Sequence, residues 1–220
     1  MAELSVPSAE IYQFRVVLCG VSPLVWRRLL VTSKTSLAEL HYILNTVFHW
    51  SGEHLHRFRI HGKDYGIPQG GGIVFDEDAR RVPLSRFRLH CGERFRYEYD
   101  FTAEWNLDIR LEKVLPFDPR WPIPLCTAGR RAAPPEYCCG VRDYLERLDR
   151  HRYPFEAVAI VAEAVQRLLD SEGDRKAIDD LDELRESLER VEAYENFQPD
   201  RFERRQVNQQ LRAISREVEP

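Results

Sequence analysis

Residues 94–112 read RFRYEYDFTAEWNLDIRLE, and two runs of strict alternation in this stretch decide the fold. In residues 94–101 every second side chain is Phe or Tyr, and in residues 105–112 every second one is Trp, Leu or Ile. Alternation of apolar and polar residues is typical of a strand with one buried face. The residues between the runs, 102–104, predict a short turn. The stretch therefore predicts an antiparallel hairpin with aromatic side chains inward and charged side chains outward.

Pairing Phe101 with Trp105 sets the expected register of this hairpin. In that register two outward pairs bring like charges together, Glu98 with Asp108 and Arg96 with Arg110. Like charges directly opposite each other are destabilising. We therefore expect arginines of the same face to neutralise the outward acids, Glu98, Asp100 and Asp108. The alternative is that these carboxylates hold a divalent metal for phosphodiester chemistry.

The rest of the chain adds strands before the hairpin and helices after it. Alternation predicts strands over residues 11–19, 24–31 and 54–61. Ser36 and Glu39 form a capping box, which predicts a helix from residue 37 that ends near Gly52. Residues 116–135 contain several prolines and predict a loop, and helical spacing follows from residue 141. The fold class is α+β, with a mostly antiparallel sheet, a packed N-terminal-half helix and a helical C-terminal extension.

Two parts are expected within a single structural unit. Residues 11–150 form an α+β core domain, and residues 151–220 form a helical extension packed on that core. In the extension, apolar residues recur at spacings of three and four on both sides of residues 171–174, which predicts a helical hairpin. A chain of 220 residues is long enough to fold on such a core without disulfides.

Composition narrows the function classes and the compartment. The chain has 36 acidic and 32 basic residues, and its net charge of −4 argues against a strongly basic protein that coats nucleic acid or an anionic membrane. Within the basic residues, 28 are Arg and only 4 are Lys. The start of the chain lacks the pattern of a secretory leader, and no apolar stretch is long enough to span a bilayer. We therefore expect a cytoplasmic protein without membrane contact, whose five cysteines are free.

The tripeptide Arg-Phe-Arg occurs three times in the chain. In a strand, both arginines of such a triplet point to one face and the phenylalanine to the other. Guanidinium groups bind phosphate through two parallel hydrogen bonds. Three neighbouring triplets would therefore form a site for anions or nucleic acid, made of Arg57, Arg59, Arg86, Arg88, Arg94 and Arg96. The alternative is that these arginines solvate an exposed strand face in an arginine-rich chain.

Three cysteines, Cys126, Cys138 and Cys139, lie at the two ends of a proline-rich loop. Together with His54 or His56 they would complete a tetrahedral zinc site. Neither Cys-x-x-Cys nor His-x-x-x-His spacing occurs, so the alternative is that they are buried or free thiols and that the protein needs no cofactor. His41 lies on the apolar stripe of its helix and is expected to be a core histidine.

Four stretches of the chain resemble the plasmid pRiA4b ORF-3-like family. They are residues 12–29, residues 37–58, residues 99–105 and residues 126–138. The family positions within them are Trp26, Arg27, His41, His54, His56, Asp100, Trp105 and Glu136. The chain departs from the family at Thr102, Ala103 and Leu107, where Gly, Asp and His are usual. The resemblance implies an α+β fold carried by plasmids and mobile elements, with no established activity and with a resolvase label on some members.

Residues and resemblance together predict a non-enzymatic accessory or interaction protein of plasmid or mobile-element origin. Its expected contact with nucleic acid is through the arginine-bearing face of the sheet. One alternative is a nucleic-acid-processing enzyme, either metal-dependent or of the resolvase type. The other is a protein-binding adaptor that uses the C-terminal hairpin. The expected partner is thus nucleic acid or a protein, and the oligomeric state is left open.

Overall fold

The computed structural model describes residues 10–68, 73–152, 155–196 and 198–217, and the chain divides into two compact units. The first unit contains residues 1–141 and 200–220, and the second contains residues 142–199. The expected boundary at residue 150 and the packing of an extension on the core stay predictions. No helix within the described ranges is long and apolar enough to cross a membrane.

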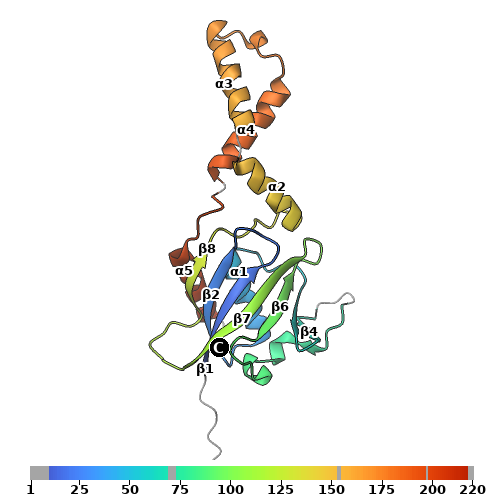
Figure 1. Ribbon diagram of the computed structural model, residues 1–220, viewed down its shortest axis with the longest axis vertical. Helices are drawn as coiled ribbons and strands as arrows, with labels where there is room; N and C mark the ends of the chain where they lie inside the picture. The colour runs from blue at the N-terminus through green and yellow to red at the C-terminus, as the bar shows by residue number, and fades with distance from the viewer. Residues whose placement is uncertain (1–9, 69–72, 153–154, 197, 218–220) are drawn as a thin grey trace, which may run out of the picture. The chain divides into compact units, whose positions relative to one another are not determined.

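The first unit is built on one sheet of eight strands in the order β5-β4-β3-β6-β7-β1-β2-β8 (Figure 1). Neighbouring strands are antiparallel, except for β4 and β5, which are parallel. The predicted α+β class with a mostly antiparallel sheet is confirmed. The strands are β1 (Glu10–Leu18), β2 (Trp26–Thr32), β3 (His56–Ile60), β4 (Lys63–Gly66), β5 (Glu77–Asp78), β6 (Arg94–Tyr99), β7 (Trp105–Pro116) and β8 (Leu125–Arg130).

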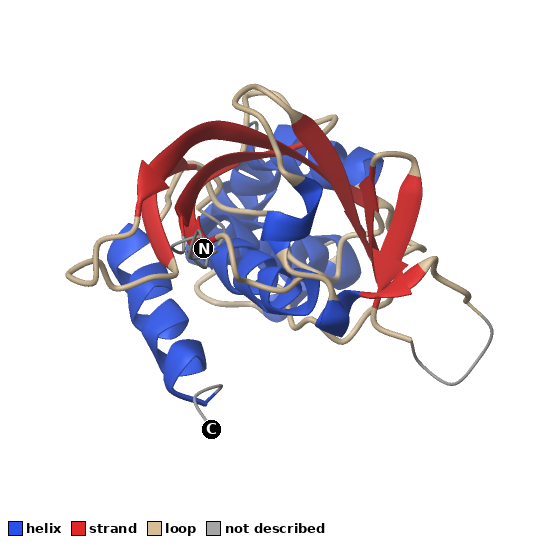
Figure 2. Cartoon of the chain, turned by 90° about the horizontal axis from the view of Figure 1, so that it is seen from below, coloured by secondary structure: helices blue, strands red, loops and turns tan. Residues whose placement is uncertain are grey.

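The core lies on the inner face of this curved sheet, beside helix α1 (Leu37–Phe48) (Figure 2). The predicted capping box is present, because Glu39 N donates to Ser36 Oγ and Ser36 N donates to Glu39 Oε2. The apolar side chains of β6 and β7 that alternate in the sequence all point inward and are buried, from Phe95 through Leu111. Alternation thus separates the buried inner face from the charged outer face.

The hairpin of β6 and β7 has a register two residues away from the predicted one, because Tyr99 rather than Phe101 pairs with Trp105. Asp100 is the reason: it adopts a left-handed conformation with φ of 54° and ends the strand. Its carboxylate accepts hydrogen bonds from the backbone N–H groups of Thr102 and Ala103, at 3.0 and 3.3 Å. A shift of two residues keeps every side chain on its predicted face but changes its partner across the strands.

Short helices replace the expected strand in the second Arg-Phe-Arg triplet, residues 86–88. Two 3-10 helices, η1 (Ala79–Arg81) and η2 (Leu84–Phe87), follow β5. Arg86 lies in η2, and Arg88 follows it in a left-handed conformation with φ of 48°. The expectation that this triplet is a strand is therefore wrong, and its two arginines do not alternate with a phenylalanine on a sheet.

Helix α5 (Arg204–Glu217) belongs to the first unit and packs against β8 and α1. Val207 and Leu211, one turn apart, are fully buried and anchor it. Before the helix, the ring of Phe202 lies 3.9 Å from the guanidinium carbon of the buried Arg27. Phe202 therefore lies in the segment that leads into the final helix.

The second unit is helical. It contains α2 (Val141–Arg152, from residue 142), α3 (Phe155–Asp170), the 3-10 helix η3 (Arg175–Ala177) and α4 (Leu181–Asn196). Helices α3 and α4 pack against each other as the predicted hairpin. Gly173, with φ of 93°, donates its N–H to the Leu168 carbonyl at 2.7 Å and ends α3.

Gly129 tests how closely Phe202 packs against β8. A Cβ added at Gly129 would lie 2.4 Å from Cε1 of Phe202, which is closer than any real contact. We expect Gly129→Ala to lower the free energy of unfolding by about 1–3 kcal/mol, because the ring must move off Arg27. Urea unfolding at pH 7 measures this change. Adding Phe202→Leu should recover part of the loss, and strictly additive effects of the two substitutions would contradict this packing.

Candidate functional site

The outer face of the sheet carries four arginines in one unbroken row. Arg94 lies opposite Arg110, Arg110 opposite Arg15, and Arg15 opposite Arg28, so the row crosses β6, β7, β1 and β2. We call these four residues the arginine row. Their side chains are exposed on β6 and β7 and half-buried on β1 and β2. Opposite side chains on one face stand about 5 Å apart, so the guanidinium groups form a closely spaced line of positive charge.

Carboxylates neutralise the two ends of this row. Arg28 Nε and Nη2 donate to the two carboxylate oxygens of Glu112 at 2.6 and 3.1 Å, and the pairing lowers the pKa of that carboxyl. At the other end Arg94 Nη1 donates to Asp108 at 2.8 Å. Arg15 and Arg110, in the middle, form no ion pair with any residue of the described ranges. Neither central arginine therefore forms an ion pair of its own, although the charge of Arg15 contributes to lowering the pKa of Glu112.

An aromatic ring and a surface hollow lie beside the row. The guanidinium carbons of Arg15 and Arg28 lie 5.1 and 5.6 Å from the centre of the Trp26 ring. The neighbouring hollow, about 780 Å³ in volume, is lined by apolar residues, four of them leucines, and by basic and polar residues and one carboxylate, among them Arg28, Arg110, Lys113, Glu112 and Trp121. The face therefore combines guanidinium groups with aromatic surface, and phosphate-bearing ligands are bound by such combinations.

The structure brings four of the six predicted arginines together. Strands β3 and β6 are neighbours, and Arg59 lies opposite Arg96. Arg59 is held by two hydrogen bonds to Asp64, at 2.8 and 3.0 Å, and Arg57 Nε donates to Glu98 at 2.7 Å. Arg96 forms no hydrogen bond or ion pair within the residues that the structure covers. Arg86 and Arg88, on and beside η2, stand apart from this sheet face, and Arg86 is paired with Glu77.

Two of the three predicted acids are paired with arginines as expected, and Asp100 is not. Glu98 accepts from Arg57, Asp108 accepts from Arg94, and Asp100 accepts from the backbone of its own turn. Because the register of the hairpin differs by two residues from the predicted one, Glu98 lies opposite Asn106 instead of Asp108, and Arg96 lies opposite Asp108. No separate acidic site for a metal results from this arrangement.

Three arginines of the outer face, Arg15, Arg28 and Arg110, were not among the predicted site residues. Arg15 and Arg110 lie at outward positions of strands that alternate clearly, so their direction could be read from the sequence, whereas residues 24–31 around Arg28 do not alternate. What the sequence does not display is that β1 lies between β7 and β2, which lines up their arginines. The missing information is the order of the strands.

Six of the eight family positions gather around Tyr99, where β6 ends. Tyr99 lies opposite both His56 and Trp105, and its hydroxyl donates to Glu136 at 2.6 Å. The other three contact this group: His41 stacks on His56, and His54 lies 3.9 Å from Asp100. Trp26 and Arg27, in contrast, lie on β2, where Trp26 is on the outer face and Arg27 is in the core.

Hydrogen bonds in this cluster tie separate segments together. Ser51 Oγ donates to Glu136 Oε1 at 3.0 Å, and Gly52 N donates to the Tyr99 hydroxyl at 3.0 Å. Burial and the bond to Glu136 raise the pKa of Tyr99, so it stays protonated at neutral pH. The cluster thus fastens the end of α1 and the loop with Glu136 to the sheet.

His41 and His56 form a stacked pair inside this cluster. Their ring centres lie 3.6 Å apart with an angle of 16° between the planes, and both residues are almost fully buried. His41 Nδ1 lies 2.7 Å from the hydroxyl of Tyr97, whereas His56 Nε2 has no partner among the described residues. Burial lowers the pKa of His41 to about 4 and that of His56 to about 3. Both rings are therefore neutral at pH 7.

The cysteines are all free thiols. Cys126 is buried in β8, and burial raises its pKa to about 11, so its thiol is protonated at neutral pH. Cys138 is buried and Cys139 is exposed. Within the ranges that the structure covers, no three His, Cys, Asp or Glu side chains lie together in a group that could hold a metal ion.

The histidine pair predicts a pH dependence of stability. Both groups have a folded-state pKa below their ordinary value near 6.5, so the unfolded chain binds more protons between these values. Stability should therefore fall as the pH drops from 7 to 5, by about 2 kcal/mol for each histidine. His49, whose pKa burial also lowers, adds to the same slope.

Urea unfolding at pH 7, 6 and 5 measures this slope. The substitution His56→Phe keeps a ring in the stack and removes one titrating group, so it should reduce the loss between pH 7 and 5. His90→Phe is the control, because His90 is almost fully exposed and should leave the slope unchanged. A slope that His56→Phe does not alter would contradict the assignment.

The chain is similar in sequence to proteins whose roles are not known. It is 34% identical over 112 residues to the uncharacterized protein y4hQ of Sinorhizobium fredii, a match that covers 49% of this chain and 56% of that protein's length. A crystal structure of the protein of unknown function MM3350 from Methanosarcina mazei Go1 resembles the fold with a TM-score of 0.67 and 25% identity, over 90% of this chain and 97% of that one. The family model described as "Plasmid pRiA4b ORF-3-like protein" matches residues 10–206, and the chain therefore belongs to the plasmid pRiA4b ORF-3-like family, as its motifs predicted.

Proposed function

We propose that the protein is a non-enzymatic accessory factor that binds the phosphate backbone of nucleic acid through the outer face of its sheet. The observation that carries this proposal is the arginine row, whose two central members, Arg15 and Arg110, have no carboxylate partner in the described ranges. Like charges held opposite one another are unfavourable in the free protein, and an anion bound between them would relieve that repulsion.

The dimensions of the row suit a phosphate backbone. Neighbouring strands are about 4.8 Å apart, so a row across four strands spans about 14 Å. Each strand of duplex DNA carries one phosphate per 3.4 Å of helix axis, and because the backbone winds around that axis its successive phosphates are farther apart, so the row corresponds to about two or three phosphates. Arginine can bind phosphate through two parallel hydrogen bonds, and contacts of this kind do not depend on base sequence. The expected binding is therefore general for backbone rather than specific for sequence.

A salt series tests the proposal. Binding of labelled duplex and single-stranded oligonucleotides, followed by fluorescence anisotropy, should give a plot of log K against log salt with a slope of about −2 to −3. The double substitution Arg15→Gln and Arg110→Gln removes the two unneutralised charges and should make the slope less steep by about 2.

The matched control is Arg86→Gln with Arg88→Gln, which removes the same charge from the region of η2. It should leave both affinity and slope close to those of the unmodified protein. The proposal fails if the protein does not bind at 20 mM salt, or if the two double variants behave alike.

A further inference from the structure

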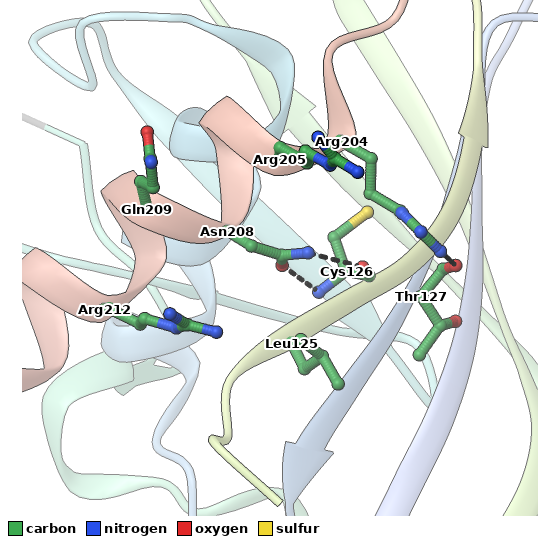
Figure 3. Close-up of a pocket in the computed structure, with 8 residues that line it drawn as sticks. All are labelled: Leu125, Cys126, Thr127, Arg204, Arg205, Asn208, Gln209 and Arg212. Carbon is green, nitrogen blue, oxygen red and sulfur yellow. Dashed lines mark hydrogen bonds between the residues drawn. The ribbon is translucent and has the colours of Figure 1, made fainter.

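A second basic site lies at the edge of the sheet, between β8 and α5. A pocket of about 460 Å³ opens there, within the range of ordinary small-ligand sites. Figure 3 shows the residues that line it, which come only from these two elements: Leu125, Cys126, Thr127, Arg204, Arg205, Asn208, Gln209 and Arg212. Three of them are arginines, and none is a carboxylate.

Asn208 fixes the geometry of this pocket. Its side-chain amide accepts from Cys126 N at 2.8 Å and donates to Cys126 O at 2.9 Å, as a neighbouring strand would. Arg204, one turn earlier on α5, donates to the Thr127 carbonyl at 2.7 Å. In Figure 3 Arg204 and Arg212 extend from the helix toward β8 on either side of Asn208. With Val207 and Leu211 buried beneath it, the polar face of α5 is held rigidly beside the strand.

The positive charge of the pocket lacks compensation. Arg205 and Arg212 are exposed and form no ion pair or hydrogen bond with the residues described, and Arg204 bonds a neutral carbonyl. The first turn of α5 holds no acidic residue, although acids are favoured at the positive end of a helix. A rigid, arginine-lined pocket without a carboxylate is suited to an anion that guanidinium groups bind in pairs.

We propose that this pocket binds a phosphate group carried by a nucleotide. Two sources share that chemistry, a free mononucleotide and the 5′-terminal phosphate of a nucleic-acid strand. Arg205 and Arg212 would hold the phosphate oxygens, and Gln209, on the same face of the helix, would donate a further hydrogen bond. The site shares no arginine with the arginine row, which lies on the outer face of the sheet, although Leu125 and Thr127 line both this pocket and the hollow beside the row.

The experiment measures binding of AMP by calorimetry, and of two short oligonucleotides that differ only in a 5′-phosphate by anisotropy, all to the full chain. Arg205→Gln with Arg212→Gln should weaken binding of the phosphate-bearing probe by about tenfold or more. Arg15→Gln with Arg110→Gln is the control: it should weaken both oligonucleotides alike through the arginine row, and leave AMP binding and the difference between the two oligonucleotides unchanged. The two proposed sites therefore fail or succeed separately.

A third variant guards against a loss that merely reflects unfolding. Gln209→Glu places a carboxylate next to Arg205 and Arg212 at helical spacing, so it should abolish phosphate binding without lowering the melting temperature. Binding of AMP that depends on these residues supports a free nucleotide, and an advantage of the 5′-phosphate without AMP binding supports a strand end. If neither probe depends on Arg205, Gln209 or Arg212, the proposal is overturned.

Discussion

The buried guanidinium of Arg27 is the constraint on which the placement of the C-terminal helix depends. Its Nε donates to the Val47 carbonyl of α1 at 2.8 Å, and its Nη1 donates to the carbonyls of Trp26 and Arg130 at 2.9 and 3.1 Å. The rings of Phe48 and Phe202 cover the guanidinium. Burying such a charge is costly unless its donors are satisfied, so β2, α1, β8 and the entry to α5 must come together around it. The pocket between β8 and α5 follows from that arrangement.

The same strand connects this core to the charged face. Because side chains alternate along β2, Arg27 points into the core and Arg28 must point outward, opposite Arg15. The inward partners of Arg27 therefore hold the outward position of Arg28 as well. The repulsion along the row is reduced at its ends by Glu112 and Asp108 and is left in the middle. Because the core holds the strands that carry these arginines in place, less conformational freedom is lost when this face binds a ligand.

Local patterns in the sequence predicted the secondary-structure elements of this fold better than they predicted which elements lie next to each other. Alternation gave the inward and outward faces of β6 and β7 correctly, and the capping box located the start of α1. The register of the hairpin could not be read in this way, because it depends on the left-handed turn at Asp100. The order of the strands cannot be read from local patterns at all. The arginine row exists only because β1 pairs with both β7 and β2. The arginines of the α5 pocket, Arg204, Arg205 and Arg212, lie seven and eight residues apart, which is a helical spacing, but the strand edge that they face cannot be read from the sequence.

The net charge of the chain conceals a division between its two units. Residues 142–199 contain 9 basic and 16 acidic residues, whereas the unit with the sheet contains 23 basic and 20 acidic ones. The sheet unit thus has a formal charge of +3, and the helical unit has −7. At physiological ionic strength charges are screened within about 8 Å, so a bound anion responds to the arginines that it touches rather than to the total.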